Sequence, residues 1–375
     1  MKDLQTSRDE IDSIDKQIVS LFERRMKIVE DVAAYKIKTG KAVLDVSREK
    51  EKLDALTSLT DNEFNKQGIR ELFKQIMALS RKLQYSMIAQ NEKMPEFNEV
   101  SELKKTEDIK VVYFGEKGSY TEQAMRENFG DKVRVFQEST FKKIMEIIND
   151  GKADYGVLPI ENTSTGGIGD IYDLLVKFDN YIVKEHVVKI EHALLGLPGA
   201  SLSDITKVYS HPQALQQSSK FLDQHKNMKQ IQCFSTSYGA KKVLEDKDIN
   251  QAAIASLSAG KQYNLCVLAE KINDSNVNST RFIIISNKRE FINNANKVSV
   301  CFELPHESGS LYDILSHISY NNLNMTNIES RPVENKNFEY RFFVDFEGNL
   351  KDAGVRNAIV GMRAEANNFK VLGNF

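Results

Sequence analysis

One segment carries the strongest structural signal in this sequence, Tyr155-Gly156-Val157-Leu158-Pro159-Ile160-Glu161-Asn162-Thr163-Ser164. An apolar run is followed directly by polar residues, which is typical of a buried strand that ends in a loop. In α/β proteins, ligands bind in the loops at the ends of strands. The segment therefore predicts an α/β domain with a candidate site at Glu161, Asn162 and Thr163. The alternative is that Asn162 or Thr163 only caps a helix.

Strand and helix patterns alternate on both sides of this segment, between residues 109 and 290. Apolar runs such as Lys110–Phe114 and Phe282–Ser286 are separated by helical stretches such as Thr140–Asn149. This alternation predicts a mostly parallel sheet that is covered by helices on both faces. A segment of this length is sufficient for two lobes.

Three shorter motifs in the same segment add candidate residues. The first is Gly115-x-x-Gly118-Ser119, which follows a strand and opens a helix, so that its backbone N–H groups could bind an anion. The second is Ser210-His211-Pro212-Gln213, and the third is Thr280-Arg281-Phe282. Each motif has a purely structural alternative. The first could be a plain turn, the second a capped turn, and the third part of an edge strand without a functional role.

The first 90 residues have a different pattern, with no proline and only two glycines. Apolar residues recur at helical spacing, which predicts one long helix at about 4–38 and another at about 66–90. A shorter helix between them would begin after Asp45 or Ser47 as its N-cap. We expect no strand in this part of the chain.

Arg25 interrupts the apolar stripe of the first helix. A buried cation costs several kcal/mol unless it is paired. Lys36 lies 11 residues further on, about 20° around the helix, so the two side chains could close around a small anion. On the third helix, Ser80 and Gln84 are four residues apart and share one face. The alternative is a helical dimerisation arm with ordinary salt bridges.

Arg8 is about 25 Å along the helix axis from Arg25, which is too far for both to hold one small molecule. If Arg8 serves the same site, it comes from a second protomer. A helix of about 50 Å also cannot bury its apolar stripe within ninety residues. Both points predict an interlocked dimer.

Together, these helical residues resemble the all-helical chorismate mutase family across residues 1–90. The matching set is Arg8, Arg25, Lys36, Asp45, Arg48, Glu49, Ser80 and Gln84. The resemblance implies a pericyclic rearrangement of chorismate to prephenate, in which two arginines hold the carboxylates. Lys36 and Gln84 would donate hydrogen bonds to the ether oxygen, where negative charge grows. Arg48 and Glu49 would orient the substrate.

The ordered motifs of residues 109–290 resemble prephenate dehydratase. This resemblance implies a fold like that of two-lobed periplasmic binding proteins, with prephenate in the cleft losing carbon dioxide and hydroxide to give phenylpyruvate. Thr280 would hydrogen-bond the leaving hydroxyl, Arg281 would anchor the retained carboxylate, and Phe282 would form an apolar wall. The other candidate residues are Ser119, Glu161, Asn162 and Thr163.

The last segment, residues 297–375, predicts a ferredoxin-like β-α-β-β-α-β unit. Gly309-Ser310-Leu311 opens its first helix, and Glu329-Ser330-Arg331-Pro332 ends a strand. These two elements resemble an ACT regulatory domain, which in related dehydratases binds phenylalanine at a subunit interface. The resemblance implies a phenylalanine site at Gly309, Ser310, Leu311, Glu329 and Ser330. The alternative is a dimerisation module without a ligand.

The composition excludes several classes of function. The net charge of −2 gives no global field that would recruit nucleic acid or an acidic membrane. No apolar run approaches the ~20 residues of a membrane span, and the first residues lack the apolar core of a signal peptide. Three widely spaced cysteines favour a reducing compartment, the cytoplasm. The six histidines have no partner at metal-ligand spacing, so we expect neither a metal nor a cofactor.

These segments predict a multidomain protein. It would have an all-α helical domain at 1–90, a linker at 91–108, a two-lobed α/β domain at 109–290 and a ferredoxin-like α+β domain at 297–375. The resemblances imply a bifunctional chorismate mutase–prephenate dehydratase, a homodimer or homotetramer that is inhibited by L-phenylalanine. Two alternatives stay open: a dehydratase whose helices form only a dimerisation arm, and a non-catalytic amino-acid sensor.

Overall fold

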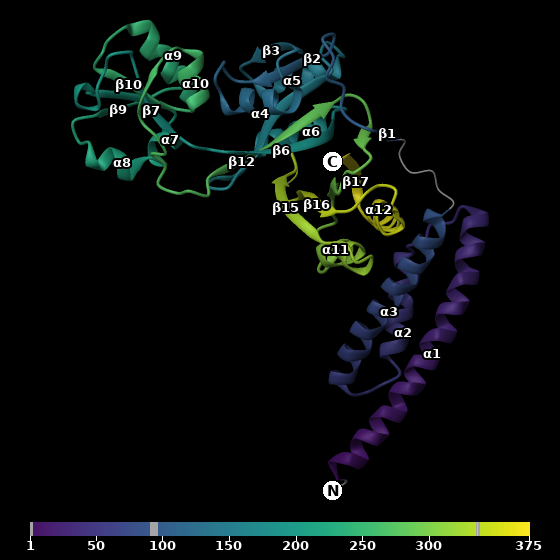
Figure 1. The fold of residues 1–375 in the computed structure, drawn as a ribbon. Helices are drawn as coiled ribbons and strands as arrows, with labels where there is room; N and C mark the ends of the chain where they lie inside the picture. Colours follow the sequence, from purple (N-terminus) through teal and green to yellow (C-terminus); the bar gives the residue numbers. More distant parts are fainter. Residues whose placement is uncertain (1–2, 91–96, 335, 337) are drawn as a thin grey trace.

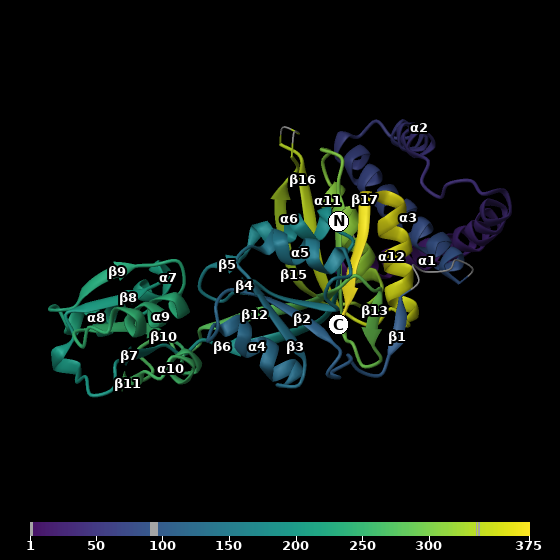
Figure 2. The same ribbon diagram turned by 90° about the horizontal axis from the view of Figure 1, so that it is seen from above.

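The structure, a computed structural model, describes residues 3–90, 97–334, 336 and 338–375. A helical bundle lies at one end of the molecule and a separate α/β lobe at the other (Figure 1). Between them lie the C-terminal unit and a first α/β lobe (Figure 2). The chain therefore forms successive bodies, each built from one of the segments that the sequence distinguishes.

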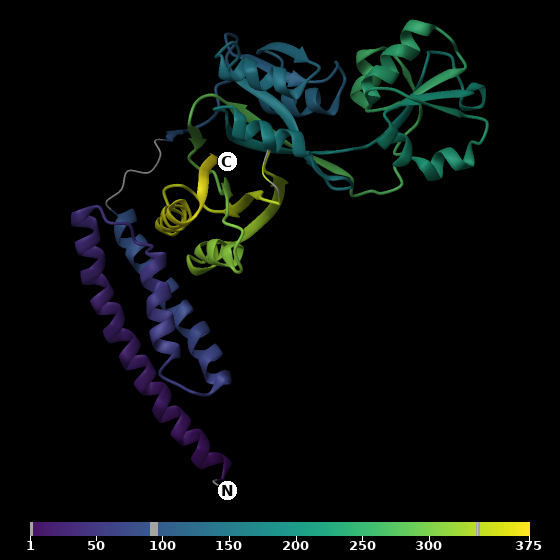
Figure 3. The same cartoon turned by 180° about the vertical axis from the view of Figure 1, so that it is seen from behind.

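The bundle consists of the three helices that the sequence predicts: α1 (Leu4–Thr39), α2 (Val46–Thr57) and α3 (Glu63–Ala89). Helix α1 runs alongside α2 and α3, and the N-terminus lies at the far end of the bundle (Figure 3). Asp45 caps α2, because its side chain accepts a hydrogen bond from the backbone N–H of Arg48. No helix in the described ranges has both the length and the apolar character that crossing a bilayer requires.

Most large apolar side chains of α1 are exposed. Within Leu4–Thr39, all of which is described, the buried residues are Val29 and Ala33. The exposed large apolar side chains of the same helix are Leu4, Ile11, Ile14, Ile18, Val19, Leu21, Ile28, Val32, Tyr35 and Ile37. An exposed apolar stripe of this length is typical of a protein–protein interface.

The first α/β lobe has a five-stranded sheet. Its strands are β2 (Lys110–Phe114), β3 (Arg134–Glu138), β4 (Tyr155–Asn162), β6 (Tyr181–Lys189) and β12 (Ser279–Ser286), with the short β5 (Gly166–Gly167) beside β4. Its helices are α4 (Tyr120–Phe129), α5 (Phe141–Asn149) and α6 (Gly169–Lys177). Alternate residues of each strand enter two separate cores, one beneath α4 and one beneath α5 and α6.

The second lobe is built in the same way. Its strands are β7 (Ala193–Gly196), β8 (Lys207–Ser210), β9 (Lys229–Gln232), β10 (Gln251–Ala255) and β11 (Cys266–Ala269). Its helices are α7 (Pro212–Gln216), α8 (Ser219–Gln224), α9 (Thr236–Asp246) and α10 (Leu257–Gln262), with a 3₁₀ turn at Leu202–Asp204. The chain enters this lobe after β6 and returns to the first lobe through β12 (Figure 1).

The prediction of a mostly parallel sheet is wrong. In the first lobe β2 pairs in parallel with β3 and β4, but β12 pairs antiparallel with both β4 and β6. In the second lobe β8 pairs in parallel with β9 and β10, whereas β7 is antiparallel to β10 and β11. The cause is the connection between the lobes, because β6 leaves the first lobe and β12 returns to it, so the two strands run in opposite directions.

The C-terminal unit has the β-α-β-β-α-β order that the sequence predicts. Its elements are β14 (Lys297–Glu303), α11 (Ser310–Tyr320), β15 (Met325–Pro332), β16 (Tyr340–Glu347), α12 (Ala353–Glu365) and β17 (Asn367–Asn374). The strand order β15-β16-β14-β17 is ferredoxin-like, and β17 pairs in parallel with β6 of the first lobe at Gly373 and Ile182. A Cβ atom at Gly373 would collide with the Ile182 carbonyl, so glycine allows the two sheets to join.

The predicted linker is more structured than its polar composition indicates. Residues 91–96 lie outside the described residues, but β1 (Asn98–Val100) pairs in parallel with β13 (Glu290–Ile292), which lies between the predicted α/β and C-terminal domains. Leu103 is buried as well. Strands of three residues are too short for a side-chain period to show in the sequence.

Candidate active sites and effector site

In the helical bundle, Arg25 of α1 and Ser80 of α3 face each other. Arg25 Nη1 donates a hydrogen bond to Ser80 Oγ, and Ser80 Oγ donates to the carbonyl of Ile76 at 2.6 Å. Burial lowers the pKa of Arg25, and the negative charge of Glu49 opposes this effect. A guanidinium stays protonated in proteins, so the bundle holds a partly buried cation at the predicted position.

Lys36 and Gln84 supply further hydrogen-bond donors. Lys36 Nζ donates to the carbonyl of Val43 at 2.7 Å, and Gln84 Nε2 donates to the carbonyl of Ser80 at 3.1 Å. Burial lowers the pKa of Lys36, while the carboxylates of Asp45 and Glu49 oppose the shift. An ammonium has three N–H groups and an amide nitrogen has two, so both side chains keep a donor for a ligand.

The residues at the start of α2 have different roles. Asp45 accepts hydrogen bonds from the backbone of Arg48 at 3.0 Å and from Ser47 Oγ at 2.8 Å, which lower the pKa of its carboxyl group. Its carboxylate is therefore used as a helix cap. Arg48 is exposed and pairs with Glu51. Glu49 accepts two hydrogen bonds, of 2.7 and 2.8 Å, from Nη1 of Arg81, a residue that the sequence analysis missed.

Arg8 is not brought to this group within one copy of the chain. It is exposed on α1, seventeen positions before Arg25, or roughly 25 Å along the helix. Its side chain has no hydrogen bond or ion pair to any of the described residues. The single chain thus contains all members of the predicted set in one bundle, with Arg8 apart from the others.

In the cleft of the α/β lobes, Thr280 and Asn162 form the closest contact between predicted residues. They are register partners on β12 and β4, and Asn162 Nδ2 donates to Thr280 Oγ1 at 2.8 Å. Asn162 Nδ2 also lies 3.0 Å from Asn278 Oδ1. Thr163 Oγ1 accepts from the backbone of Ser279 at 3.0 Å and donates to the carbonyl of Val277 at 3.2 Å. These contacts fix the 161–164 loop against the segment before Thr280.

A chain of hydrogen bonds extends this cluster into the second lobe. Gln217 Nε2 donates to Ser164 Oγ at 2.6 Å, and Gln217 Oε1 accepts from Asn278 Nδ2 at 2.9 Å. His192 lies next in the chain, with Nε2 3.2 Å from Gln217 Oε1 and Nδ1 3.0 Å from Tyr120 Oη. Burial lowers the pKa of His192 to about 4, so the imidazole is neutral at pH 7.

The sequence analysis did not select Gln217, His192 or Asn278 as site residues. Asn278 is two positions before Thr280, and a period of two places both on one face of a strand, so it could have been found. Gln217 and His192 have no such signal, because their role depends on the relative placement of the lobes. A cavity of ≈ 130 Å³ lies beside this cluster, lined by Thr163, Ser164, Gln217, Asn273, Asp274, Ser275, Val277 and Asn278.

Arg281 lies on the opposite face of β12 from Thr280 and contacts the C-terminal unit. Its Nη1 donates to Asp345 at 2.9 Å and lies 3.4 Å from Glu185, and its Nε donates to Glu161 at 3.1 Å. Burial opposes its charge, but Asp345 and Glu161 more than offset this and hold the pKa of Arg281 above its usual value. Three carboxylates thus lie at Nε and Nη1, while the buried Nη2 has no hydrogen-bond partner among the described residues. Arg281 therefore links the first lobe to the C-terminal unit, and its role as a carboxylate anchor stays a prediction. Glu161 is likewise engaged within the chain, because its carboxylate accepts the hydrogen bond from Arg281 Nε.

Phe282 and Ser119 have mainly structural contacts. Phe282 is buried in the core beneath α4. Ser119 is the N-cap of α4, and its Oγ accepts from the backbone of Glu122 at 3.2 Å. The preceding Gly118 packs on the second lobe, since a Cβ there would lie 2.7 Å from Ala259 Cα. Ser119 therefore marks a contact between the lobes, outside the hydrogen-bonded cluster of Thr280.

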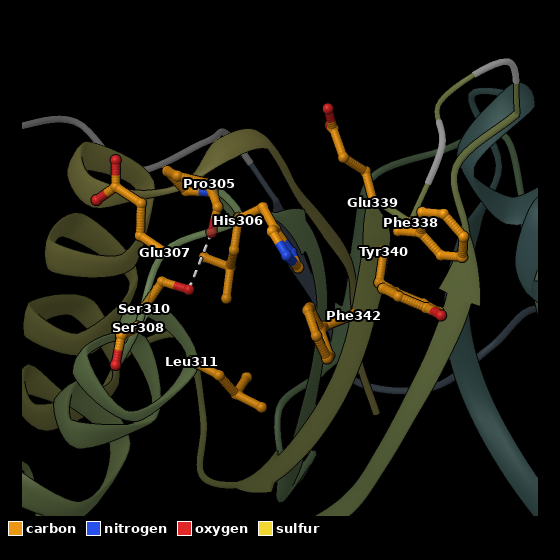
Figure 4. Close-up of a pocket in the computed structure, with 11 residues that line it drawn as sticks. Pro305, His306, Glu307, Ser308, Ser310, Leu311, Phe338, Glu339, Tyr340 and Phe342 are labelled. Carbon is orange, nitrogen blue, oxygen red and sulfur yellow. Dashed lines mark hydrogen bonds between the residues drawn. The ribbon is translucent and has the colours of Figure 1, made fainter.

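The C-terminal unit contains a cavity of ≈ 320 Å³ between the start of α11 and the start of β16 (Figure 4). The cavity is lined by the apolar or aromatic residues Leu304, Leu311, Phe338, Tyr340 and Phe342 and by the polar residues His306, Glu307, Ser308, Ser310 and Glu339. Ser310 Oγ donates to the carbonyl of Pro305 at 3.0 Å, which closes the loop before the helix. The loop residue Gly309 has a positive φ of 89°.

Glu329 and Ser330 do not line this cavity. They lie on β15, the edge strand of the large sheet. Glu329 faces Gly167 of the first lobe, where a Cβ atom would lie 3.4 Å from Glu329 Oε2. The next charged residue, Arg331, donates to Asp173 of α6 at 2.7 Å. Within one copy, the two halves of the predicted phenylalanine site are separate, and the second half contacts the dehydratase-like lobe.

Comparisons with known proteins cover nearly the whole chain. Residues 7–85 match the family described as chorismate mutase type II, and residues 111–290 match prephenate dehydratase. The chain is 32% identical over 372 residues to the bifunctional chorismate mutase/prephenate dehydratase of Escherichia coli (strain K12), which covers 98% of this chain and 94% of that relative.

Solved structures resemble about 70% of the chain. A prephenate dehydratase from Arthrobacter aurescens in complex with L-Phe has a TM-score of 0.66 and 29% identity, covering 71% of this chain and 89% of that one. A structure described as a novel type of quorum-quenching acylase has a TM-score of 0.65 and 26% identity, covering 70% of this chain and 96% of that one. One fold can host different chemistry. The full-length similarity decides the family, and the chain belongs to the bifunctional chorismate mutase/prephenate dehydratases.

Proposed function

We propose that this protein converts chorismate to prephenate at residues 1–90 and prephenate to phenylpyruvate at residues 109–290. We further propose that residues 297–375 are an ACT domain through which phenylalanine inhibits the enzyme. The full-length similarity to bifunctional relatives carries the proposal. The free cysteines Cys233, Cys266 and Cys301 support a cytoplasmic location.

The mutase step requires no nucleophile. The enzyme must hold a dicarboxylate in its reactive conformer and stabilise the negative charge that grows on the ether oxygen. Arg25 provides a fixed cation for a carboxylate, and Lys36 and Gln84 each keep a free N–H for the ether oxygen. Glu49 would accept a hydrogen bond from the substrate hydroxyl, and Arg48, which is exposed, would help to orient the substrate.

The mutase site would be completed by a second copy of the chain. Arg8 is too far from Arg25 to act in the same site, and the apolar stripe of α1 is exposed. A two-fold dimer in which the long helices pack side by side would bury the stripe and bring the partner's Arg8 to the site. A homodimer is thus the smallest active unit, and a homotetramer would add contacts between the C-terminal units.

The dehydratase step requires loss of a carboxylate and a hydroxyl from the prephenate ring. The Thr280 hydroxyl accepts from Asn162, so its hydrogen is available to the leaving hydroxyl. Gln217 comes from the second lobe and already contacts Ser164 of the first. Closure of the lobes around prephenate would therefore tighten this cluster and exclude water.

The effector site would combine two surfaces. The C-terminal cavity offers apolar side chains for a ring, and polar side chains such as Ser310 for an amino-acid group. Glu329 and Ser330 lie on an exposed edge strand, where a second copy can pair. Phenylalanine bound between two copies would contact both surfaces, and Glu329 would carry its effect to the first lobe.

The test follows chorismate, prephenate and phenylpyruvate together in one reaction, with and without phenylalanine. We expect chorismate to disappear, prephenate to rise and then fall, and phenylpyruvate to accumulate. Phenylalanine should slow the final step. A purified protein that makes no phenylpyruvate from prephenate would refute the dehydratase assignment, and one that leaves chorismate unchanged would refute the mutase assignment.

A further inference from the structure

The helical bundle and the C-terminal unit are in direct contact through α3 and α12. Val43, Tyr85 and Ala89 of the bundle pack with Val360 of α12 in one buried apolar cluster. Arg81 lies at the same contact and is only 9% exposed. A buried arginine at a junction between two domains requires partners, and they come from both sides.

Arg81 binds one carboxylate from each domain. Its Nη1 donates to both oxygens of Glu49 in the bundle, at 2.7 and 2.8 Å, and its Nε donates to Glu365 of α12 at 2.7 Å. Glu365 also lies 3.3 Å from Nε2 of His317 on α11, which is 2% exposed. The four side chains form a continuous polar cluster from the bundle to the effector unit.

The burial of this cluster couples its members. Burial opposes the charge of Arg81, but Glu365 and Glu49 more than offset this, so its pKa stays above the usual value. Removing one partner of a buried ion pair leaves an uncompensated charge, which is strongly unfavourable. The position of the Arg81 guanidinium, and with it the orientation of Glu49, therefore depends on Glu365.

Glu49 is at the same time part of the proposed mutase site. Burial lowers the pKa values of Arg25 and Lys36, and the negative charge of Glu49 opposes this effect at both cations. Its side chain is 28% exposed, so it keeps an accessible surface for a ligand. Glu49 is thus both a member of the proposed mutase site and a partner of Arg81 in the interdomain cluster.

We propose that Arg81 is a positioning residue for the mutase reaction, and that Glu365 of the C-terminal unit holds it in place. This inference rests on the proposed mutase function of the bundle. Helix α11 begins at Ser310, which lines the effector cavity, and reaches His317 two turns later, about 10 Å along its axis. The cluster is therefore a physical connection from the effector cavity to the mutase site.

Three variants of the full-length protein test the proposal. Arg81→Met removes the guanidinium that binds both carboxylates. Arg81→Lys keeps the positive charge, but an ammonium cannot bind Glu49 and Glu365 in the same geometry. Glu365→Gln removes only the negative charge of the C-terminal unit. The matched control is Arg70→Met, because Arg70 also pairs α3 with α2, at Asp54, but does so on the exposed surface. Dehydratase activity in each preparation reports whether the protein is folded.

We expect Arg81→Met to lower the mutase kcat by about ten- to hundredfold with little change in KM, since orientation rather than binding is lost. Arg81→Lys should recover part of this loss, and Glu365→Gln should lower kcat several-fold. The double variant Arg81→Met/Glu365→Gln should be no slower than Arg81→Met alone, because both act through one side chain. Arg70→Met should behave as the original protein.

The outcomes separate this inference from the proposed function. An unsubstituted protein without mutase activity would refute the function itself. An active protein in which Arg81→Met or Glu365→Gln keeps the full mutase kcat would overturn the positioning role. Additive losses in the double variant would also overturn it, because they would mean that Glu365 acts independently of Arg81. If Arg81→Met does not fold, Arg81→Lys and Glu365→Gln decide the question.

Discussion

Asn162 Nδ2 donates a 2.8 Å hydrogen bond to Thr280 Oγ1 across the paired strands β4 and β12. Because the threonine oxygen is the acceptor in this bond, its own hydroxyl hydrogen can donate elsewhere. The Thr280 side chain therefore has one fixed contact and one free donor. Interaction with a leaving hydroxyl requires this arrangement.

We predict that Thr280→Val lowers the dehydratase kcat by about a hundredfold, because valine keeps the shape but has no proton to share. Phenylpyruvate formation from prephenate measures the effect. Mutase activity in the same preparation should be unchanged, and Thr280→Ser, which restores a hydroxyl, should recover much of the rate. Normal phenylpyruvate formation by Thr280→Val would remove Thr280 from the reaction.

If the mutase site is shared between two copies of the chain, a mixture of two inactive variants should regain activity. Arg8→Ala and Arg25→Ala should each lower mutase activity by about a hundredfold or more, because each removes a carboxylate contact. If the variants are unfolded, mixed and refolded together, half of the dimers should be heterodimers with one intact site each. The mixture should then regain about a quarter of the original activity.

The control for this experiment is Arg24→Ala, since Arg24 is an exposed neighbour of Arg25 on the same helix. It should leave the rate unchanged. A refolded mixture that stays inactive would mean that Arg8 and Arg25 do not come from different copies. Full activity of Arg25→Ala alone would instead favour the simple dimerisation arm.

Leu311 supplies apolar surface to the C-terminal cavity. We predict that Leu311→Ala raises the Kd of phenylalanine by roughly tenfold, the loss expected from one to two kcal/mol of apolar contact. Isothermal titration calorimetry with L-phenylalanine measures the change. Ser316→Ala on the same helix does not line the cavity and should bind as before. Equal affinity of both variants would place the effector elsewhere.

His192 should make stability depend on pH. Its folded pKa is about 4, because of burial, against about 6.5 for a histidine in the unfolded chain. Between these values the unfolded chain binds a proton that the folded chain does not, so acid favours unfolding. The stabilising contribution of the neutral ring is complete above about pH 6.5 and is lost as the pH falls toward about 4.

We therefore expect His192→Gln to flatten the acid limb of the stability curve, by on the order of 3 kcal/mol over the whole window. Urea unfolding of both proteins, followed by circular dichroism at several values between about pH 7 and pH 5, tests this. Curves that stay parallel over the window would show that His192 titrates normally in the folded protein.

The sequence predicted whole elements well, and it predicted side-chain direction less well. The helices 4–39 and 63–89 follow from apolar spacing, and the contact of Arg25 with Ser80 follows from the faces that they share. By contrast, the family resemblance places Thr280 and Arg281 in one site, although neighbouring strand residues point to opposite faces. Applying that alternation would have placed Arg281 on the C-terminal side of the sheet.

Other site residues could not be predicted because they depend on the arrangement of domains. Gln217 reaches Ser164 only because the second lobe lies beside the first. Arg81 is an ordinary charged helix residue in the sequence, and its importance comes from Glu365, 284 positions later. Contacts over such separations leave no local period or motif to read.

The junction at Gly373 and Ile182 also limits how the protein can be divided. Because β17 continues the sheet of the first lobe, β6 has a neighbour on both sides. A chain cut before Lys297 would uncover an unpaired strand edge, and such edges recruit other chains. The C-terminal unit therefore covers the edge of β6 at Ile182, and a shortened enzyme would need a new cover for it.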